Sequence, residues 1–259
     1  MTTDLHYQIL GNARGRTLVL LHGLGSDGRM WRDAVALLGE RYRIVVYDRR
    51  GAGRSPRATE PQTLERELAD LEAVLDAAGV TEVVPVGCAM GTMVAATFAA
   101  RHPGRVPALV LSTCGLRVAD GRVGDVIRKR AGLVLKAASL GPVLPAAVEV
   151  AFNGLPLDDR YRAFLAAVAE NDPQSYANIL LGSIDHDIST LVQDIGCPTL
   201  VLAGRLDRGW GPGPCRAVFE ALPNASFVVV EKAAHFIPYQ APTAFARLVD
   251  GFVAGALGD

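Results

Sequence analysis

The 259-residue sequence lacks a long apolar run, a surplus of either charge and any close pair of cysteines. Its 26 Lys and Arg nearly balance its 27 Asp and Glu, so no net field attracts nucleic acid or an acidic membrane surface. No uninterrupted run of about 18 apolar residues occurs, and no apolar stretch follows a basic start at the N-terminus. We therefore expect a cytoplasmic protein with a small-molecule substrate, no nucleic-acid partner and no membrane association; the composition leaves the oligomeric state open.

The cysteines are few and widely separated, and none has a CxxC or Cys/His spacing. Zinc sites and redox-active pairs depend on such spacings. We expect reduced, mostly buried thiols and no bound metal. The four cysteines are Cys88, Cys114, Cys197 and Cys215.

Half of the residues are hydrophobic and a fifth are charged, which is enough apolar material for a large core. Short β-branched runs alternate with segments of helical spacing, a pattern typical of an α/β fold with a mostly parallel sheet and helices on both faces. The clearest helical pattern covers residues 63–78, and Gly79 follows it as a stop. Strands are expected at residues 17–21, 43–47, 82–87, 108–112, 198–204 and 226–230.

One long segment interrupts this alternation. Residues 116–195 contain no strand-like run, only helical stretches that glycine and proline break. We interpret the chain as a single domain, residues 1–259, with a core at residues 1–115 and 196–259 and a helical cap at about 116–195 inserted between two strands. The apolar stretch 131–152 could wall a substrate pocket or simply pack on the core, and the basic cluster 127–130 is expected on a solvated helix face, with an anion site as the alternative.

The segment 84–102 has the form of a strand, a glycine-framed turn and an apolar helix. This is the form of a nucleophile elbow, in which the central residue of G-x-Nu-x-G sits on a strained strand-to-helix turn. The two glycines allow neighbouring backbone to pass closely. Here Gly87 and Gly91 frame Ala89, so the central position carries a methyl group in place of a nucleophile.

At this point the chain resembles the α/β-hydrolase family, with motifs in the family's order along nearly the whole chain. Within the family it is similar to the small lactone and ester hydrolases with a helical cap, such as 3-oxoadipate enol-lactonase. The resemblance implies the α/β-hydrolase fold, a small-molecule substrate and no cofactor. The motifs are LHGLGSDGRMW (21–31), YDRRGAGRSP (47–56), VGCAMGT (86–92), LAGRLDRGW (202–210) and EKAAHF (231–236).

The resemblance also implies roles for individual residues. The family's acid corresponds to Asp207 and its base to His235, and a histidine oriented by a carboxylate can move a proton to and from a reacting group. The oxyanion hole corresponds to the backbone N–H groups of Leu24 and Met90. We expect His22 to shape the turn that leads into the oxyanion loop, the glycine-rich segment 23–28.

Other readings of these residues remain open. His235 could be a core histidine bonded to backbone, and Leu24 and Met90 could be turn and helix-terminus donors that need only water. Asp185 and Asp187 flank a histidine and are an alternative carboxylate source, although helix capping is the simpler interpretation. Cys88 could replace the missing nucleophile, but it lies one residue before the central position and should point away from the base.

Ala89 is the main departure from the family pattern, because a methyl group cannot form an acyl-enzyme. Ala52 and Thr92 are milder departures, at positions where the family usually has histidine and glycine. An engineered Ser-to-Ala change that traps substrate is one reading of Ala89. A natural alanine, with His235 and Asp207 activating water or moving a proton, is another; aminoacrylate hydrolases of pyrimidine breakdown resemble this case and carry GHALG at the elbow. A non-catalytic binding member is the third.

The sequence therefore predicts a cofactor-independent hydrolase of a small lactone, ester or enol-type substrate that uses a His–Asp pair and a backbone oxyanion hole. The alternatives are a non-covalent enzyme that activates water or transfers a proton on an enamine or enol, and a binding protein. Mutation of His235 distinguishes them, because it abolishes a reaction in an enzyme and only weakens binding in a binding protein.

Overall fold

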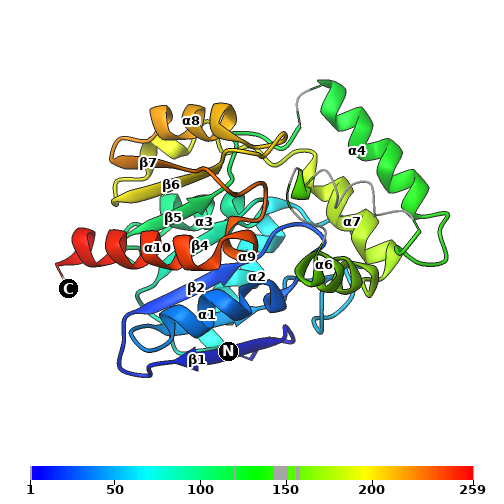
Figure 1. The fold of residues 1–259 in the computed structure, drawn as a ribbon. Coiled ribbons are helices and arrows are strands. Elements are labelled where there is room, and N and C mark those ends of the chain that lie inside the picture. The colour runs from blue at the N-terminus through cyan, green and yellow to red at the C-terminus, as the bar shows by residue number, and fades with distance from the viewer. Residues whose placement is uncertain (1, 120, 143–150, 154, 156–157, 259) are drawn as a thin grey trace.

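A computed structural model of the chain describes residues 2–119, 121–142, 151–153, 155 and 158–258. At its centre is a seven-stranded sheet with the order β1-β3-β2-β4-β5-β6-β7 (Figure 1). β1 pairs antiparallel with β3, and the other neighbours pair in parallel. The strands are β1 Tyr7–Gly11, β2 Thr17–Leu21, β3 Arg43–Tyr47, β4 Val84–Cys88, β5 Leu109–Ser112, β6 Thr199–Gly204 and β7 Ala225–Val230.

The six strands expected from the sequence are all present, each within two residues of its predicted ends. β1 was not predicted. It lies at the edge of the sheet and is half-buried to exposed along its length, so it lacks the apolar run that marks the central strands.

Helices cover both faces of the sheet, as predicted, because each central strand is buried on both sides. In β2, Leu18 and Leu20 belong to one apolar cluster, and Val19 and Leu21 belong to the other. The first cluster packs under α1 Arg32–Leu38 and α10 Pro242–Leu257, which lie side by side (Figure 1). The second packs under α2 Leu64–Ala77, α3 Gly91–Arg101 and α8 Pro212–Ala221.

The predicted helix at residues 63–78 is α2, and its ends have clear local causes. The Thr63 side chain caps the first turn by accepting the backbone N–H of Arg66. At the other end Gly79 adopts φ 63°, a left-handed conformation that glycine reaches without strain. The apolar side of α2, which includes Leu71 and Leu75, is buried against the sheet.

Between β5 and β6 the chain forms α4 Gly121–Val134, α6 Asp159–Ala169 and α7 Pro173–Ser183, which group at one side of the molecule (Figure 1). Asp158 and Asp172 cap α6 and α7, and α4 packs on α7. Part of the predicted cap, and most of the second half of the apolar stretch 131–152, lies outside the described residues. In the part that the structure describes, no helix is long and apolar enough to span a membrane.

Candidate active site

Ala89 occupies a strand-to-helix turn, between the end of β4 at Cys88 and the start of α3 at Gly91. Its φ is 51°, a left-handed conformation that costs a non-glycine residue about 1–2 kcal/mol. The turn is held in place from the neighbouring strand, because the Ala89 N–H donates to the Ser112 carbonyl at 2.9 Å. Strain maintained by surrounding structure is typical of functional turns, and here it presents a methyl group.

The glycines around this turn are required by close backbone approach. A Cβ on Gly87 would lie 2.7 Å from the carbonyl oxygen of Gly91, and a Cβ on Gly91 would lie 2.2 Å from that of Leu21. A Cβ on Gly23 would lie 3.0 Å from the Ala89 Cβ. The loop after β2 and the turn after β4 therefore touch directly, which brings two separate motifs into one site.

His235 and Asp207 meet on loops that follow the carboxyl ends of β7 and β6. His235 Nδ1 lies 2.8 Å from Asp207 Oδ2, and the other carboxylate oxygen of Asp207 accepts the Gly209 N–H at 2.8 Å. Burial disfavours the carboxylate, but the hydrogen bond from His235 and the backbone N–H groups of Gly209 and Trp210 outweigh it and lower the pKa of Asp207. The acid is thus ionised at neutral pH and fixes the histidine with Nδ1–H toward it.

The predicted oxyanion donors are the backbone N–H groups of Leu24 and Met90. Both residues line the same cavity as Ala89 and His235. Neither N–H donates to a protein acceptor within the described ranges. Two free donors beside a histidine can stabilise a negative oxygen that develops on a substrate carbonyl.

The cavity that contains these groups has a volume of about 310 Å³, the low end of the range for small-molecule sites. Its walls come from the core loops and from the helices between β5 and β6. Most of the lining is apolar or aromatic, with His235 and Arg130 as the ionisable side chains among the described lining residues that could carry a positive charge. The lining residues are Leu24, Gly25, Ala89, Met90, Val118, Arg130, Ala151, Phe164, Val168, Tyr176, Gly209, Trp210, His235 and Phe236.

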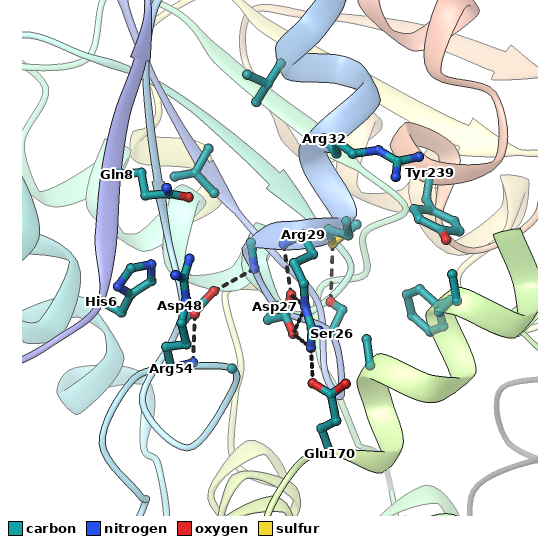
Figure 2. Close-up of a pocket in the computed structure, with 18 of the residues that line it drawn as sticks. His6, Gln8, Ser26, Asp27, Arg29, Arg32, Asp48, Arg54, Glu170 and Tyr239 are labelled. Carbon is teal, nitrogen blue, oxygen red and sulfur yellow. Dashed lines mark hydrogen bonds and ion pairs between the residues drawn. The ribbon is translucent and has the colours of Figure 1, made fainter.

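A larger outer pocket, of about 1010 Å³, is lined in part by residues 26–30 of the segment that follows β2 (Figure 2). Figure 2 shows Arg29 between two carboxylates, Asp27 at 2.7 Å and Glu170 at 2.7 Å. On the same wall Asp48 accepts the N–H groups of Gly28 and Arg54, both at 2.8 Å. These acids therefore hold the loop that follows β2 and tie it to Glu170 at the end of α6.

His22 lies beneath the same loop and supports it, as the sequence suggested. It is 1% exposed; Nδ1 contacts the Gly23 carbonyl at 2.9 Å, and Nε2 accepts the Arg49 N–H at 2.9 Å. Burial lowers the pKa of His22, so the ring is neutral and accepts at Nε2. The Arg49 guanidinium in turn pairs with the buried carboxylate of Glu67. Sequence reasoning missed this charge pair because α2 reads as an ordinary amphipathic helix.

The alternative groups weighed from the sequence lie elsewhere. Cys88 is fully buried and contacts Thr113, and burial raises the pKa of its thiol to about 12, so it carries no thiolate at neutral pH. Asp187 pairs with Arg117 at 2.8 Å and accepts the Ser189 N–H; it lies in an isolated antiparallel bridge with Arg117 and not at a helix N-terminus. Asp207 is the carboxylate that contacts His235.

Arg130 departs from its expected position. The cluster 127–130 was expected on a solvated face, which holds for Arg128 and Lys129, both exposed, but Arg130 is half-buried and lines the cavity. Its guanidinium hydrogen-bonds the Tyr176 hydroxyl and lies 5.4 Å from the centre of that ring. Helical spacing alone does not show which side of α4 faces the site, so this residue could not be identified from the sequence. Within the described part of the chain, no cluster of three or more His, Cys, Asp or Glu forms a candidate metal site.

Comparisons with known proteins also indicate the α/β-hydrolase fold. Residues 16–124 match the family model described as the alpha/beta hydrolase fold. The chain is 30% identical to the putative carbamate hydrolase RutD of Caulobacter sp. (strain K31), over 97% of this chain and 96% of that protein. It is 23% identical to 3-oxoadipate enol-lactonase 2 of Acinetobacter baylyi, over 95% and 91%. The solved enol-lactonase of Burkholderia xenovorans LB400 superposes with a TM-score of 0.91, at 25% identity and 96% coverage of both chains.

Proposed function

The chain belongs to the α/β-hydrolase family, and on that basis we propose that it is a cofactor-independent hydrolase in which His235 activates water directly and no acyl-enzyme forms. One observation carries the proposal. The strained elbow presents the methyl group of Ala89, while the His235–Asp207 pair and two unengaged N–H donors surround the same cavity. This arrangement supports acid–base catalysis with oxyanion stabilisation, while the elbow position offers no side chain that could hold an acyl group.

In the proposed reaction a single side chain, His235, accepts and returns the proton. Because Nδ1–H of His235 points to Asp207, Nε2 is the free acceptor and takes a proton from a water molecule. The water oxygen bonds to the substrate carbonyl carbon, and the carbonyl oxygen becomes an oxyanion between the N–H groups of Leu24 and Met90. When the bond to the leaving atom breaks, the protonated His235 returns the proton to that atom. Water is consumed, and the site returns to its starting state.

The substrate class follows from the cavity and from the named relatives. A mostly apolar space of about 310 Å³ suits a small molecule. One relative is named a putative carbamate hydrolase and others are named enol-lactonases. We therefore propose a small carbonyl substrate of lactone, ester, carbamate or enol type. With an enol or enamine the reaction would start from His235 protonated at both nitrogens. Nε2 would give its proton to the substrate carbon, and it would then take one proton from the water that adds to the resulting electrophilic carbon, which restores the starting state.

The test is the variant His235→Ala, assayed with the unaltered protein on a panel of small enol-lactones, esters and carbamates. General acid–base catalysis by one side chain contributes about 10²–10⁴-fold, and we expect a loss of that size in kcat/KM. His102→Ala is a matched control, because the half-buried His102 pairs with Glu72 at 2.7 Å between α3 and α2, and neither residue lines the cavity. If His235→Ala weakens ligand binding and no panel member is turned over by either protein, the binding-protein alternative is correct.

A further inference from the structure

Thr113 directly follows β5, and its side chain contacts the loop that carries His235. We propose that Thr113 is a positioning residue: its hydroxyl fixes the backbone of His235 and so keeps the imidazole aligned between Asp207 and the cavity. This inference deepens the proposed function. It rests on that function for its effect on the reaction rate, although not for its effect on the orientation of the ring.

The first observation is the strained backbone of Thr113. Its φ is 54°, and in the described part of the chain Ala89 at the elbow is the other non-glycine residue with a positive φ. A β-branched residue in this conformation is an outlier, because its side chain crowds the backbone, whereas glycine adopts it freely. Such strain persists only where surrounding contacts maintain it, and it is concentrated at functional sites. The contacts of Thr113 must therefore oppose its relaxation.

The second observation is what those contacts are. The Thr113 N–H donates to the Leu202 carbonyl of β6 at 2.8 Å. The hydroxyl oxygen lies 2.7 Å from the His235 carbonyl oxygen and 2.6 Å from that of Ser112. The Ser112 carbonyl already accepts the Ala89 N–H, whereas no backbone N–H among the described residues donates to the His235 carbonyl. The single hydroxyl proton therefore satisfies the carbonyl of His235.

The third observation is that the backbone of His235 is held at both ends. Its N–H donates to the Ala151 carbonyl at 3.1 Å, and its carbonyl accepts from Thr113. The imidazole is held separately, with Nδ1 2.8 Å from Asp207. Without the Thr113 hydroxyl, the backbone would be released at one end, and the ring could turn about its single bond to the carboxylate.

These contacts predict an effect of Thr113 on catalysis and not on substrate binding. Thr113 is fully buried and is not among the described residues that line the cavity. Loss of its hydroxyl would leave Nε2 of His235 without a fixed direction, and misplacement of a catalytic group by about 1 Å can cost about 10²-fold in rate. The expected signature is a fall in kcat with an unchanged KM.

The variants Thr113→Val and Thr113→Ser test the role of the hydroxyl. Valine has nearly the shape of threonine but carries a methyl group in place of the hydroxyl, and serine keeps the hydroxyl. We expect Thr113→Val to lower kcat about 10–100-fold on a panel substrate with KM unchanged, and Thr113→Ser to keep nearly full kcat. Thr113→Ala also removes the hydroxyl and should behave as Thr113→Val; it supplies the measurement if valine disturbs the fold.

Proton NMR follows the ring without requiring turnover. The Nδ1–H proton that His235 donates to Asp207 should give a downfield resonance, assigned by its absence in His235→Ala. We expect exchange with water to broaden this resonance in Thr113→Val, because the ring is held less firmly. Thr113→Ser should retain it.

Thr97→Val is the matched control. Thr97 is also fully buried, and its hydroxyl donates to a backbone carbonyl, that of Met93, at 2.8 Å within α3. The control therefore removes a hydroxyl of the same kind without touching the His235 loop, and it should keep kcat and the resonance. Thermal unfolding of every variant separates loss of positioning from loss of the fold.

The outcomes separate this inference from the proposed function. The inference is overturned if Thr113→Val keeps both the kcat and the resonance of the unaltered protein, or if Thr113→Ser loses them to the same extent as Thr113→Val. If the unaltered protein turns over no panel substrate but its resonance depends on the Thr113 hydroxyl, the positioning role stands and the proposed hydrolase is contradicted.

Discussion

His235 Nδ1 lies 2.8 Å from Asp207 Oδ2, and the carboxylate is itself held by the Gly209 N–H at 2.8 Å. The second bond prevents the carboxylate from rotating away, so the imidazole is fixed in one tautomer with Nε2 directed to the cavity. The Thr113 hydroxyl lies 2.7 Å from the His235 carbonyl oxygen and anchors the backbone of the same loop. The orientation of His235 therefore depends on Asp207.

Replacing Asp207 with asparagine should expose this dependence. The introduced side-chain amide can present N–H to His235 and favour the opposite tautomer, a change that cost about 10⁴-fold in kcat in a serine protease. We expect a loss of about 10²–10⁴-fold in kcat/KM with an unchanged fold, measured by steady-state kinetics and circular dichroism. Asp187→Asn is the control, because that carboxylate pairs with Arg117 on the surface. Full activity in Asp207→Asn would mean that the pair does not orient the base.

The same residue should contribute to acid stability. The folded-state pKa of Asp207 lies below its usual value, so its ionised form stabilises the fold at neutral pH. That contribution is complete above the unfolded-state pKa of about 3.9 and is lost as the pH falls through the lower folded-state pKa. The difference in Tm between the unaltered protein and Asp207→Asn should therefore shrink below about pH 4. A difference that grows on acidification would contradict the direction of the shift.

Two glutamates on α2 differ sharply in their surroundings. Glu67 pairs with Arg49, and both side chains are 6% exposed, whereas Glu65 pairs with Arg101 at the surface. Glu67→Gln leaves a buried guanidinium without a counter-ion and should cost about 3–5 kcal/mol of unfolding free energy. Glu65→Gln should cost less than about 1 kcal/mol. Urea denaturation of both variants measures this difference, and equal costs would show that the Arg49–Glu67 pair does not stabilise the fold.

The glycine frame of the elbow makes a further stability prediction. A Cβ on Gly91 would meet the Leu21 carbonyl oxygen at 2.2 Å, whereas a Cβ on Gly104 would have no atom within 4 Å. Gly91→Ala must therefore displace β2 from the elbow, at a cost above about 2 kcal/mol, while Gly104→Ala should change stability by less than about 0.5 kcal/mol. Expression level and Tm are the measurements. A fully stable Gly91→Ala protein would show that this contact is dispensable.

The fold was largely predictable because buried parallel strands appear in the sequence as short, continuous apolar runs. Leu18 to Leu21 are all fully buried, and a short continuous run of this kind between turn residues is typical of a buried parallel strand. The edge strand β1 contains exposed Ile9 beside half-buried Tyr7 and Leu10, and its pairing with β3 depends on long-range contacts that no local pattern encodes.

The site was predictable only where backbone motifs define it. Gly87 and Gly91 frame the turn in the sequence itself, whereas Asp207 and His235 were identified through the resemblance to the α/β-hydrolase family. Arg130 and Tyr176 come from helices between β5 and β6, where many residues are apolar or basic on more than one side. Which of these faces the cavity depends on helix packing, which a single sequence does not specify.

Comparison of the unaltered protein with Ala89→Ser tests most directly whether hydrolysis proceeds without an acyl-enzyme. The unaltered protein, Ala89→Ser and each of these combined with His235→Ala are assayed on p-nitrophenyl acetate and on the enol-lactone and carbamate panel. Intact-protein mass spectrometry during turnover detects any acyl adduct. We predict that the unaltered protein turns over at least one panel substrate and that this activity is lost with His235→Ala. Ala89→Ser should hydrolyse the same substrate no faster. An unaltered protein inert on every substrate, together with large His235-dependent hydrolysis and an acyl adduct in Ala89→Ser, would contradict the account.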